Sequence, residues 1–168
     1  MRLIVTFLAC IAACFHIPVF SQTAASNDER EIQGTIVVLF MAMQMGDSTM
    51  ARNTFAKDVT TATVSRNKNG EAVLVQENSI ADFMKAIGTP HAGTWYEEMW
   101  DLKIEIDGDF AQAWCNYAFY IDHKFSHCGV DAFHLYRSKS GWKIFHLADT
   151  RRKTDCNVPE EIKARHQE

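Results

Sequence analysis

The chain has 168 residues and a formal net charge of −4 at neutral pH. It contains no strongly basic stretch that could neutralise a phosphate backbone, so we expect no nucleic-acid partner. The length that remains after an N-terminal leader is enough for one hydrophobic core and too short for two ordinary domains. We therefore expect a single domain over residues 23–168.

Residues 1–22 are typical of a secretory signal peptide. Arg2 supplies an early positive charge, and an apolar run follows from Leu3 to Ile17. This run contains His16 and is short for a membrane-spanning helix, which needs about 20 predominantly apolar residues. We therefore expect an exported protein, periplasmic or secreted, with no membrane attachment once the leader is removed.

The leader has two candidate cleavage positions. Small and polar residues follow the apolar run, so cleavage is expected near Ser21/Gln22 or near Ala25/Ser26. A lipoprotein-type cleavage box ending at Cys14 is an alternative. It is disfavoured because the apolar residues directly after Cys14 are unlike the polar tether of a lipoprotein.

Three cysteines remain after the leader, at Cys115, Cys128 and Cys156. An exported protein can form disulfides, and an odd number of thiols allows at most one internal pair. Cys115 lies in the middle of an apolar strand and is expected to be a buried thiol. The other two lie near strand ends, so we predict a Cys128–Cys156 disulfide. There is no CxxC spacing that could hold a closed tetrahedral shell, so we expect neither a metal site nor a cofactor.

The domain is predicted to begin with two helices. Residues 28–45 carry acidic side chains early and apolar side chains at helical spacing, namely Ile32, Ile36, Leu39, Phe40 and Met43. Gly46 supplies a stop signal. Asp47 or Ser48 can then cap a second, short helix that runs through Phe55.

A β-hairpin and a third helix are predicted next. The β-branched runs at residues 59–64 and 72–75 flank Asn67-Lys68-Asn69-Gly70, and Asn-Gly is a strong hairpin signal. The apolar spacing from Asn78 to Gly88 then predicts a helix.

The second half of the domain is predicted to be a four-stranded meander. Apolar and charged residues alternate from Trp95, and Asp107-Gly108-Asp109 forms a turn into the stretch 111–152. Turns at His123-Lys124 and at residues 138–141 divide this stretch into three long strands. Helices followed by a hairpin, a helix and a meander predict an α+β fold, with helices packed on one face of an antiparallel sheet.

These turns place residues opposite one another, with the register open by one residue. Asn116 is expected opposite Asp131, and Asp131 opposite Ala148. The residues expected on the same face are Trp114, Tyr120, His127, Phe133, Leu135, Ile144 and His146. The residues expected on the other face are Cys115, Tyr117, Phe119, Ile121, Val130, Ala132, Tyr136, Phe145 and Leu147.

The first turn of the meander leaves another choice open. A three-residue loop at Asp107-Gly108-Asp109 would place Leu102 on the face of Trp114, and a two-residue loop would place it on the face of Cys115. Both faces are apolar enough to be buried. We therefore expect one face to cover the helices and the outer face to form a homodimer.

The motifs resemble a known family. The chain has Gly46-Asp47 after its first helix, the segment Gly129-Val130-Asp131-Ala132-Phe133, and Gly141-Trp142-Lys143-Ile144. In these motifs and in its order of elements it resembles the nuclear transport factor 2-like superfamily. That resemblance implies a cone, in which a curved antiparallel sheet wraps around N-terminal helices. The C-terminal motifs are most similar to the branch of exported bacterial proteins named for lumazine binding, which implies a ligand of that type.

The resemblance also implies a candidate residue. Ketosteroid isomerases, scytalone dehydratases and polyketide cyclases of this superfamily hold acid/base residues inside the cone. The segment Asp131–Leu135 resembles the isomerase strand that carries a buried, protonated aspartic acid. We find no counterpart of the isomerase general base or of its tyrosine donor.

The candidate site lies on the face of Asp131. An aspartate enclosed by aromatic side chains would have a raised pKa, because desolvation disfavours its charged form. His146 could act as a base near neutral pH. We therefore predict Asp131 and His146 as catalytic candidates. The predicted ligand contacts are Trp100, Trp114, Asn116, His127, Phe133 and Ile144.

Two other interpretations of this face are open. Asp131 and Asn116 could satisfy each other across the strands, with His146 a hydrogen-bonded core residue. His127, Asp131 and His146 could form a metal triad, but they would span several residue rows, which disfavours this interpretation.

Three functions follow from the sequence. The first hypothesis is a domain that binds a small apolar or aromatic molecule in an apolar pocket. The second is an acid/base lyase or isomerase that uses Asp131 and His146 for enolisation, dehydration or cyclisation. The third is a non-catalytic protein-interaction domain, which would need a collapsed interior.

Overall fold

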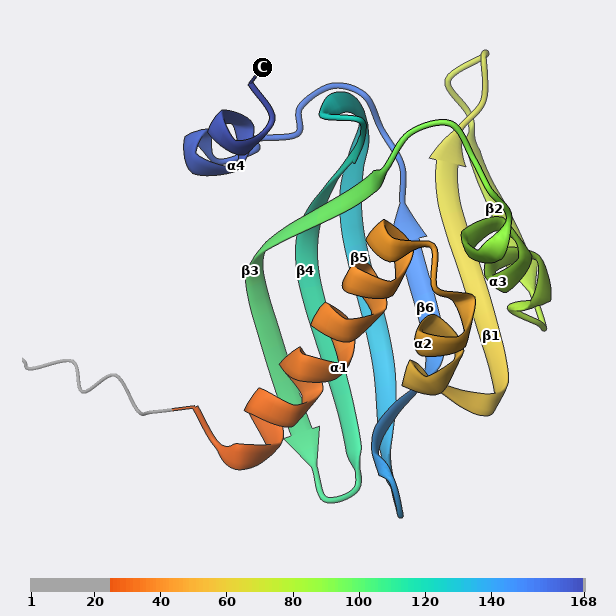
Figure 1. Cartoon of the computed structure of the whole chain (residues 1–168), viewed down its shortest axis with the longest axis vertical. Coiled ribbons are helices and arrows are strands. Elements are labelled where there is room, and N and C mark those ends of the chain that lie inside the picture. The colour runs from red at the N-terminus through yellow and green to blue at the C-terminus, as the bar shows by residue number, and fades with distance from the viewer. Residues whose placement is uncertain (1–24, 168) are drawn as a thin grey trace, which may run out of the picture.

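The computed structural model describes residues 25–167, so the predicted leader over residues 1–22 lies outside the described residues. The elements are α1 Asn27–Met45, α2 Ser48–Thr54, β1 Phe55–Arg66, β2 Ala72–Glu77, α3 Ala81–Gly88, β3 Trp95–Asp107, β4 Phe110–Ile121, β5 Lys124–Ser138, β6 Gly141–Thr150 and α4 Glu160–Arg165 (Figure 1).

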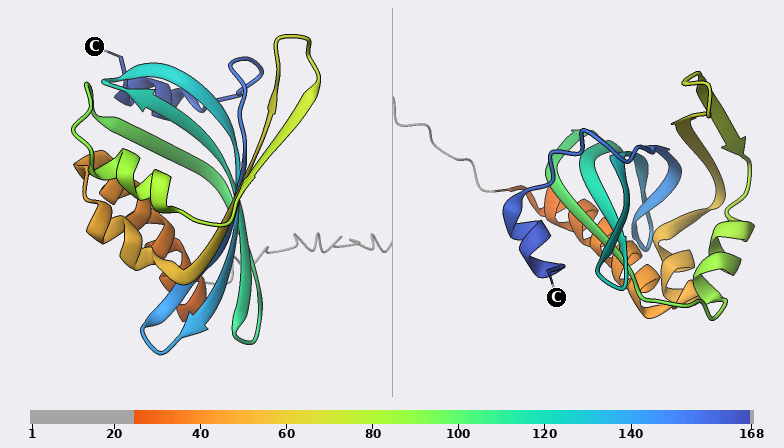
Figure 2. Two further views of the ribbon diagram at one scale, coloured as in Figure 1. Left: turned by 90° about the vertical axis from the view of Figure 1, so that its right-hand side faces the viewer. Right: turned by 90° about the horizontal axis from the view of Figure 1, so that it is seen from above.

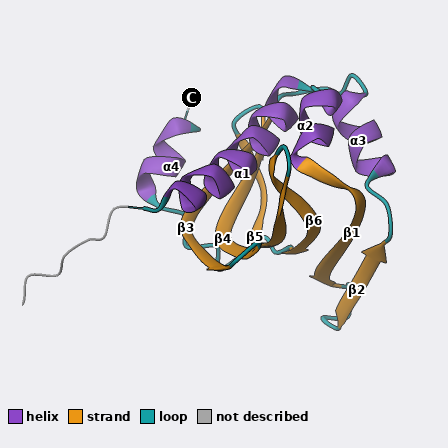
Figure 3. Cartoon of the chain, turned by 90° about the horizontal axis from the view of Figure 1, so that it is seen from below, coloured by secondary structure: helices purple, strands orange, loops and turns teal. Residues whose placement is uncertain are grey.

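The strands form one curved sheet of six strands in the order β2-β1-β6-β5-β4-β3. Helices α1, α2 and α3 lie on its inner face, and the β1–β2 hairpin projects beyond the other strands (Figures 2 and 3). The predicted α+β class and the wrapped sheet are confirmed. The sheet is antiparallel except between β1 and β6, which run parallel.

Helix α1 begins and ends where its sequence signals predict. Ser26 and Glu29 form a capping box, and Gly46 ends the helix in the left-handed region with a φ of 68°. The predicted apolar stripe is buried, and the ring of Phe40 lies 6.4 Å from that of Phe133 on β5. Burial of this stripe holds the helix diagonally across the inner face of the sheet (Figure 1).

The predicted register between β4 and β5 is wrong by one residue. The turn is Asp122-His123, one position earlier than predicted, and both residues have positive φ angles of 46° and 62°. A bulge follows in which Ser126 has no partner on β4, since Phe119 pairs with His127 and Tyr120 with Phe125. The combined effect places Cys115 opposite Asp131, where Asn116 was expected.

The register between β5 and β6 is also wrong by one residue near the site. The turn from Ser138 to Gly141 is as predicted. Phe145 then forms a bulge, since Leu135 pairs with Ile144 but His134 pairs with His146. Asp131 therefore lies opposite Asp149 and not opposite Ala148.

These shifts exchange the faces of several strands. Trp114, Asn116 and Tyr120 of β4 were expected on the inner face and point to the outer face. The β4 residues expected on the outer face point inward, namely Cys115, Tyr117, Phe119 and Ile121. On β6, Leu147 lies inside and His146 outside. A two-residue turn at Gly108-Asp109 pairs Ile104 with Ala113, so the face of Cys115 is the correct one of the two that the sequence left open.

The Cys128–Cys156 disulfide is confirmed, with a Cα–Cα distance of 5.8 Å, and Cys115 is a buried free thiol. The disulfide holds the C-terminal segment on the outer face. There Val158 and Ile162 pack against Ala118 and Tyr120 of β4. Helix α4 had not been predicted, although the acidic residues at its start and the basic residues at its end are ordinary helix signals.

Between residues 25 and 167, no helix is both long and apolar enough to cross a bilayer.

Candidate functional site

A cavity of about 480 Å³ lies on the inner face of the sheet, and α3 covers part of it. One part of its wall is apolar and is formed by Met43, Val75, Phe83, Trp95, Phe119 and Leu147. The other part is polar and is formed by Thr61, Thr63, Glu97, Tyr117, His127, Asp131, Asp149 and Arg151. A cavity of this size, with an apolar wall and a few convergent polar groups, is typical of a small-molecule site.

Two carboxyl groups meet at the polar end of the cavity. Asp131 on β5 is only 4% exposed, and its side chain hydrogen-bonds that of Glu97 on β3. Burial raises the pKa of Glu97 to about 7. Burial, with Glu97 and Asp149 as neighbours, also raises the pKa of Asp131 well above its usual range. The pair therefore holds a proton near neutral pH, and protonated Asp131 donates it to Glu97.

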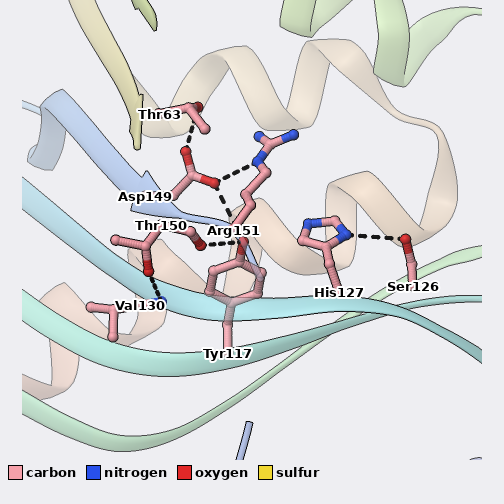
Figure 4. A network of polar contacts seen from close by, with 8 residues as sticks. All are labelled: Thr63, Tyr117, Ser126, His127, Val130, Asp149, Thr150 and Arg151. Carbon is pink, nitrogen blue, oxygen red and sulfur yellow. Dashed lines mark hydrogen bonds and ion pairs between the residues drawn. The ribbon is translucent and has the colours of Figure 1, made fainter. Parts of the chain in front are cut away.

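Asp149 is held in a network of polar contacts beside this pair (Figure 4). Its Oδ2 lies 2.6 Å from Nε of Arg151, and its Oδ1 accepts a hydrogen bond from the hydroxyl of Thr63. The hydroxyl of Tyr117 donates to Asp149 Oδ2 at 3.3 Å and to the carbonyl oxygen of Thr150 at 3.0 Å. Asp149 is thus a paired carboxylate, in contrast to the proton-sharing pair next to it.

The position of Tyr117 depends on a glycine. Gly129 on β5 pairs with Tyr117 across the strands. A Cβ at Gly129 would lie 1.7 Å from the carbonyl oxygen of Thr150 and 2.7 Å from the Tyr117 ring. Only glycine therefore lets the ring lie over β5 and its hydroxyl reach β6.

Two further ring groups line the cavity. His127 Nδ1 lies 3.0 Å from the hydroxyl of Ser126, and burial together with the charge of Arg151 lowers the pKa of His127. Trp95 is stacked on His91 with ring centroids 4.1 Å apart. The cavity thus has a neutral imidazole at neutral pH and a fixed indole.

The structure divides the residues that the sequence predicted for the site. Asp131 and His127 line the cavity. Phe133 and Ile144 also point inward but are fully buried in the core. The cavity lining does not include Trp100, Trp114, Asn116 or His146, which lie on the outer face.

The outer residues have other neighbours. Trp114 is 52% exposed. Asn116 donates to Asp101 at 3.2 Å, and His146 lies 2.7 Å from the hydroxyl of Thr60. Asn116 therefore does not hydrogen-bond Asp131, and His146 is separated from Asp131 by the sheet, which excludes the predicted Asp131–His146 pair.

Sequence reasoning missed Glu97, Tyr117, Asp149 and Arg151. Trp95, Glu97 and Met99 occupy every second position of β3 and therefore share one face of the strand. The two apolar residues were the available signal that Glu97 faces inward. Tyr117 was assigned to the wrong face by the register, and Asp149 was not assigned to a face. Arg151 shares the face of Asp149, because the two are separated by one residue and alternate residues of an extended chain point to the same side.

Among residues 25–167, no group of three or more His, Cys, Asp and Glu side chains could hold a metal ion. The side chains at the polar end of the cavity can form hydrogen bonds, pair charges and transfer protons.

Comparisons with solved structures identify the fold. An NTF2-like protein with a cystatin-like fold from Novosphingobium aromaticivorans is 15% identical over 84% of this chain and 89% of its own, with a TM-score of 0.60. A proposed dehydratase of the NTF2-like family from Streptomyces avermitilis is 12% identical over 74% of this chain and 96% of its own, with a TM-score of 0.57. The chain has the nuclear transport factor 2-like cone fold.

A third solved structure with a similar fold has a different description. A proposed calcium/calmodulin dependent protein kinase II association domain from Xanthomonas campestris is 14% identical over 78% of this chain and 92% of its own, with a TM-score of 0.59. Neither a protein-family model nor a curated protein sequence matches the chain. Because identities are this low, the comparisons establish the NTF2-like fold alone, and function must be argued from the cavity.

Proposed function

We propose that this protein binds a small organic molecule with an aromatic or apolar body in the cavity on the inner face of its sheet. The observation that carries this proposal is the cavity itself, which has an apolar wall and a polar end. A protein-interaction domain with a collapsed interior would have no such space.

The proposal can be tested with a neutral, environment-sensitive aromatic probe, N-phenyl-1-naphthylamine, followed by fluorescence titration. Ala86 on α3 is exposed and lines the cavity, so Ala86→Trp should fill part of it and weaken binding. Ala81→Trp is the matched control, because Ala81 is exposed on the same helix and is not among the lining residues. Equal affinity of both variants would refute binding in this cavity.

The identity of the ligand is a finer question. The C-terminal motifs resemble the branch named for lumazine binding, and lumazine is a bicyclic molecule that suits a cavity of about 480 Å³. Displacement of the fluorescent probe by lumazine is the expected result of that hypothesis. Native mass spectrometry of the protein purified from its own source tests the question independently, because a retained ligand adds to the polypeptide mass.

A second function is favoured by the Asp131–Glu97 pair. A protonated carboxyl group beside a carboxylate can deliver and accept protons near neutral pH, which suits enolisation, dehydration or cyclisation of a bound carbonyl compound. Glu97 takes the role that had been predicted for His146. The test is deuterium exchange into 2-tetralone in D₂O, which should be faster with the wild type than with Glu97→Gln. Exchange at the rate of buffer alone would exclude the catalytic function.

The outer face supports a proposal about assembly. Trp114, Phe110, Phe125 and Tyr136 are all exposed on this face, and apolar residues in such numbers favour a second copy of the chain as their partner. One solved structure with a similar fold is a proposed association domain. Light scattering should give a dimer mass for the wild type and a monomer mass for Trp114→Glu, and a wild-type monomer would contradict the proposal.

Export is the remaining part of the proposed function. The Cys128–Cys156 disulfide supports it, because disulfides persist in oxidising compartments. The leader at residues 1–22 and the single domain at 23–168 stay predictions. N-terminal sequencing of the protein recovered from outside the cytoplasm should begin near Gln22 or Ser26, whereas a start at Met1 would contradict cleavage.

A further inference from the structure

The charges that line the cavity are strongly unbalanced. Its acidic residues are Glu77, Asp82, Glu97, Asp131 and Asp149, and its basic ones are Arg151 and His127. The acids come from β2, α3, β3, β5 and β6, so they surround the space from several sides. The cavity therefore has a negative potential, and opposing low-dielectric walls strengthen such a potential.

The basic groups do not offset this surplus. The guanidinium of Arg151 is paired with Asp149, and His127 is a half-buried imidazole whose position beside Arg151 disfavours a second positive charge. Arg66, Arg152 and Lys153 line a neighbouring open hollow and are not among the residues that line the cavity. Glu97 and Asp131 therefore have no basic side chain of their own.

The apolar part of the wall is also suited to a positive charge. Trp95, Phe119 and Phe83 all line the cavity, and Trp95 is held by His91 on one side and by the edge contact of Phe119 at 5.8 Å. The faces of aromatic rings attract organic cations, and the attraction grows when water is excluded. A cation enclosed by these rings can at the same time approach the Glu97–Asp131 pair.

We propose that the cavity selects an organic cation, in which a protonated amine lies near Glu97 and Asp131 and an aromatic or aliphatic body packs against Trp95 and Phe119. This inference rests on the proposed function and names the class of its ligand. The buried pair keeps a proton when no cation is near, and a bound amine stabilises its ionised form in place of that proton.

The test compares three probes that share a naphthyl ring and carry a positive, a neutral or a negative group on a short side chain. These are 2-(1-naphthyl)ethylamine, 2-(1-naphthyl)ethanol and 1-naphthylacetate, each titrated calorimetrically at neutral pH. The amine should bind about tenfold more tightly than the alcohol. The attraction of its ammonium group to the carboxylates and aromatic rings of the cavity corresponds to roughly one order of magnitude in affinity. The acid should bind more weakly than the alcohol.

Two variants locate the effect. Glu97→Gln should abolish most of the advantage of the amine over the alcohol, measured as the ratio of the two affinities in the same variant. Glu77→Gln is a second variant at an exposed rim position, where folding is not at risk, and it should reduce the amine's advantage by a smaller factor. An unchanged preference for the amine in both variants would overturn the assignment of these carboxylates.

The outcomes separate this inference from the proposed function. If the alcohol binds as tightly as the amine, or the acid binds most tightly, the cation inference fails and small-molecule binding in the cavity stands. If none of the three probes and no neutral fluorescent probe binds, both fail together.

Discussion

Glu97→Gln should make the protein more stable at alkaline pH, although it removes a hydrogen-bonded residue of the candidate site. The folded state raises the pKa of Glu97 from 4.5 to about 7, because burial disfavours its carboxylate. A shift of this size corresponds to about 3 kcal/mol, or about 2 kcal/mol once the partial exposure of the group is allowed for. The glutamine side chain has no ionised form and does not incur this cost.

The sign of the pH dependence follows from proton linkage. Below about pH 4.5 Glu97 is protonated in both states, so the wild type and the variant should differ by a constant amount. Between about pH 4.5 and 7 the folded wild type binds a proton that the unfolded chain has released, so the wild-type free energy of unfolding falls as pH rises. The advantage of the variant should therefore grow across this window and be complete above pH 7.

The assay is urea unfolding followed by circular dichroism, repeated between about pH 4 and pH 8. The charged neighbours of Glu97 are Asp131, Asp149 and Arg151, and loss of Glu97 also relieves Asp131 of one like charge. Glu98→Gln is the matched control, because it removes the same charge from the outer face, where Glu98 pairs with Arg165 at 2.7 Å. The control should lose about 0.2–1 kcal/mol at alkaline pH. A Glu97→Gln advantage that does not change with pH would refute the reasoning.

The remaining predictions concern backbone fit and the disulfide. Gly129→Ala should lower the free energy of unfolding by about 2–3 kcal/mol, because its Cβ would collide with the Thr150 carbonyl. Gly34→Ala is the control, since Gly34 is exposed on α1 and a Cβ there would meet no atom within 4 Å. It should raise the free energy of unfolding by about 0.5–1 kcal/mol. Equal effects in urea unfolding would contradict the close approach at Gly129. Cys156→Ser opens a loop with a sequence separation of 28 and should cost about 3.5 kcal/mol. Reductant should lower the thermal midpoint of the wild type to that of Cys156→Ser and leave that variant unchanged, and a wild type insensitive to reductant would count against the disulfide.

The fold could be predicted from the sequence because its signals are local and agree with one another. The capping residues, the Asn-Gly hairpin and the alternation along the meander each specify one element, and the order of the elements then selects the α+β class. The pairing of Cys128 with Cys156 followed from their places at strand ends and from the central position of Cys115.

The site could be predicted only in part, because a bulge leaves no clear sequence signal. Asp131 and His127 were placed correctly, since they lie on one strand and their relative orientation needs no register. Trp114, Asn116 and His146 lie on other strands, so their faces depended on bulges that the alternating pattern does not show. Asp122 was the one available signal, because aspartate tolerates positive φ and therefore favours the first position of a tight hairpin turn.

Ser126 and Phe145 are the extra residues of two bulges, and each has consequences for how proteins of this shape can diverge. Loss of either residue would shift the pairing of its strand by one position and turn inward a different set of side chains. A single codon deletion or insertion at such a place could therefore replace several cavity residues at once while every strand is kept. We expect homologues to differ in length at these two positions when their ligands differ.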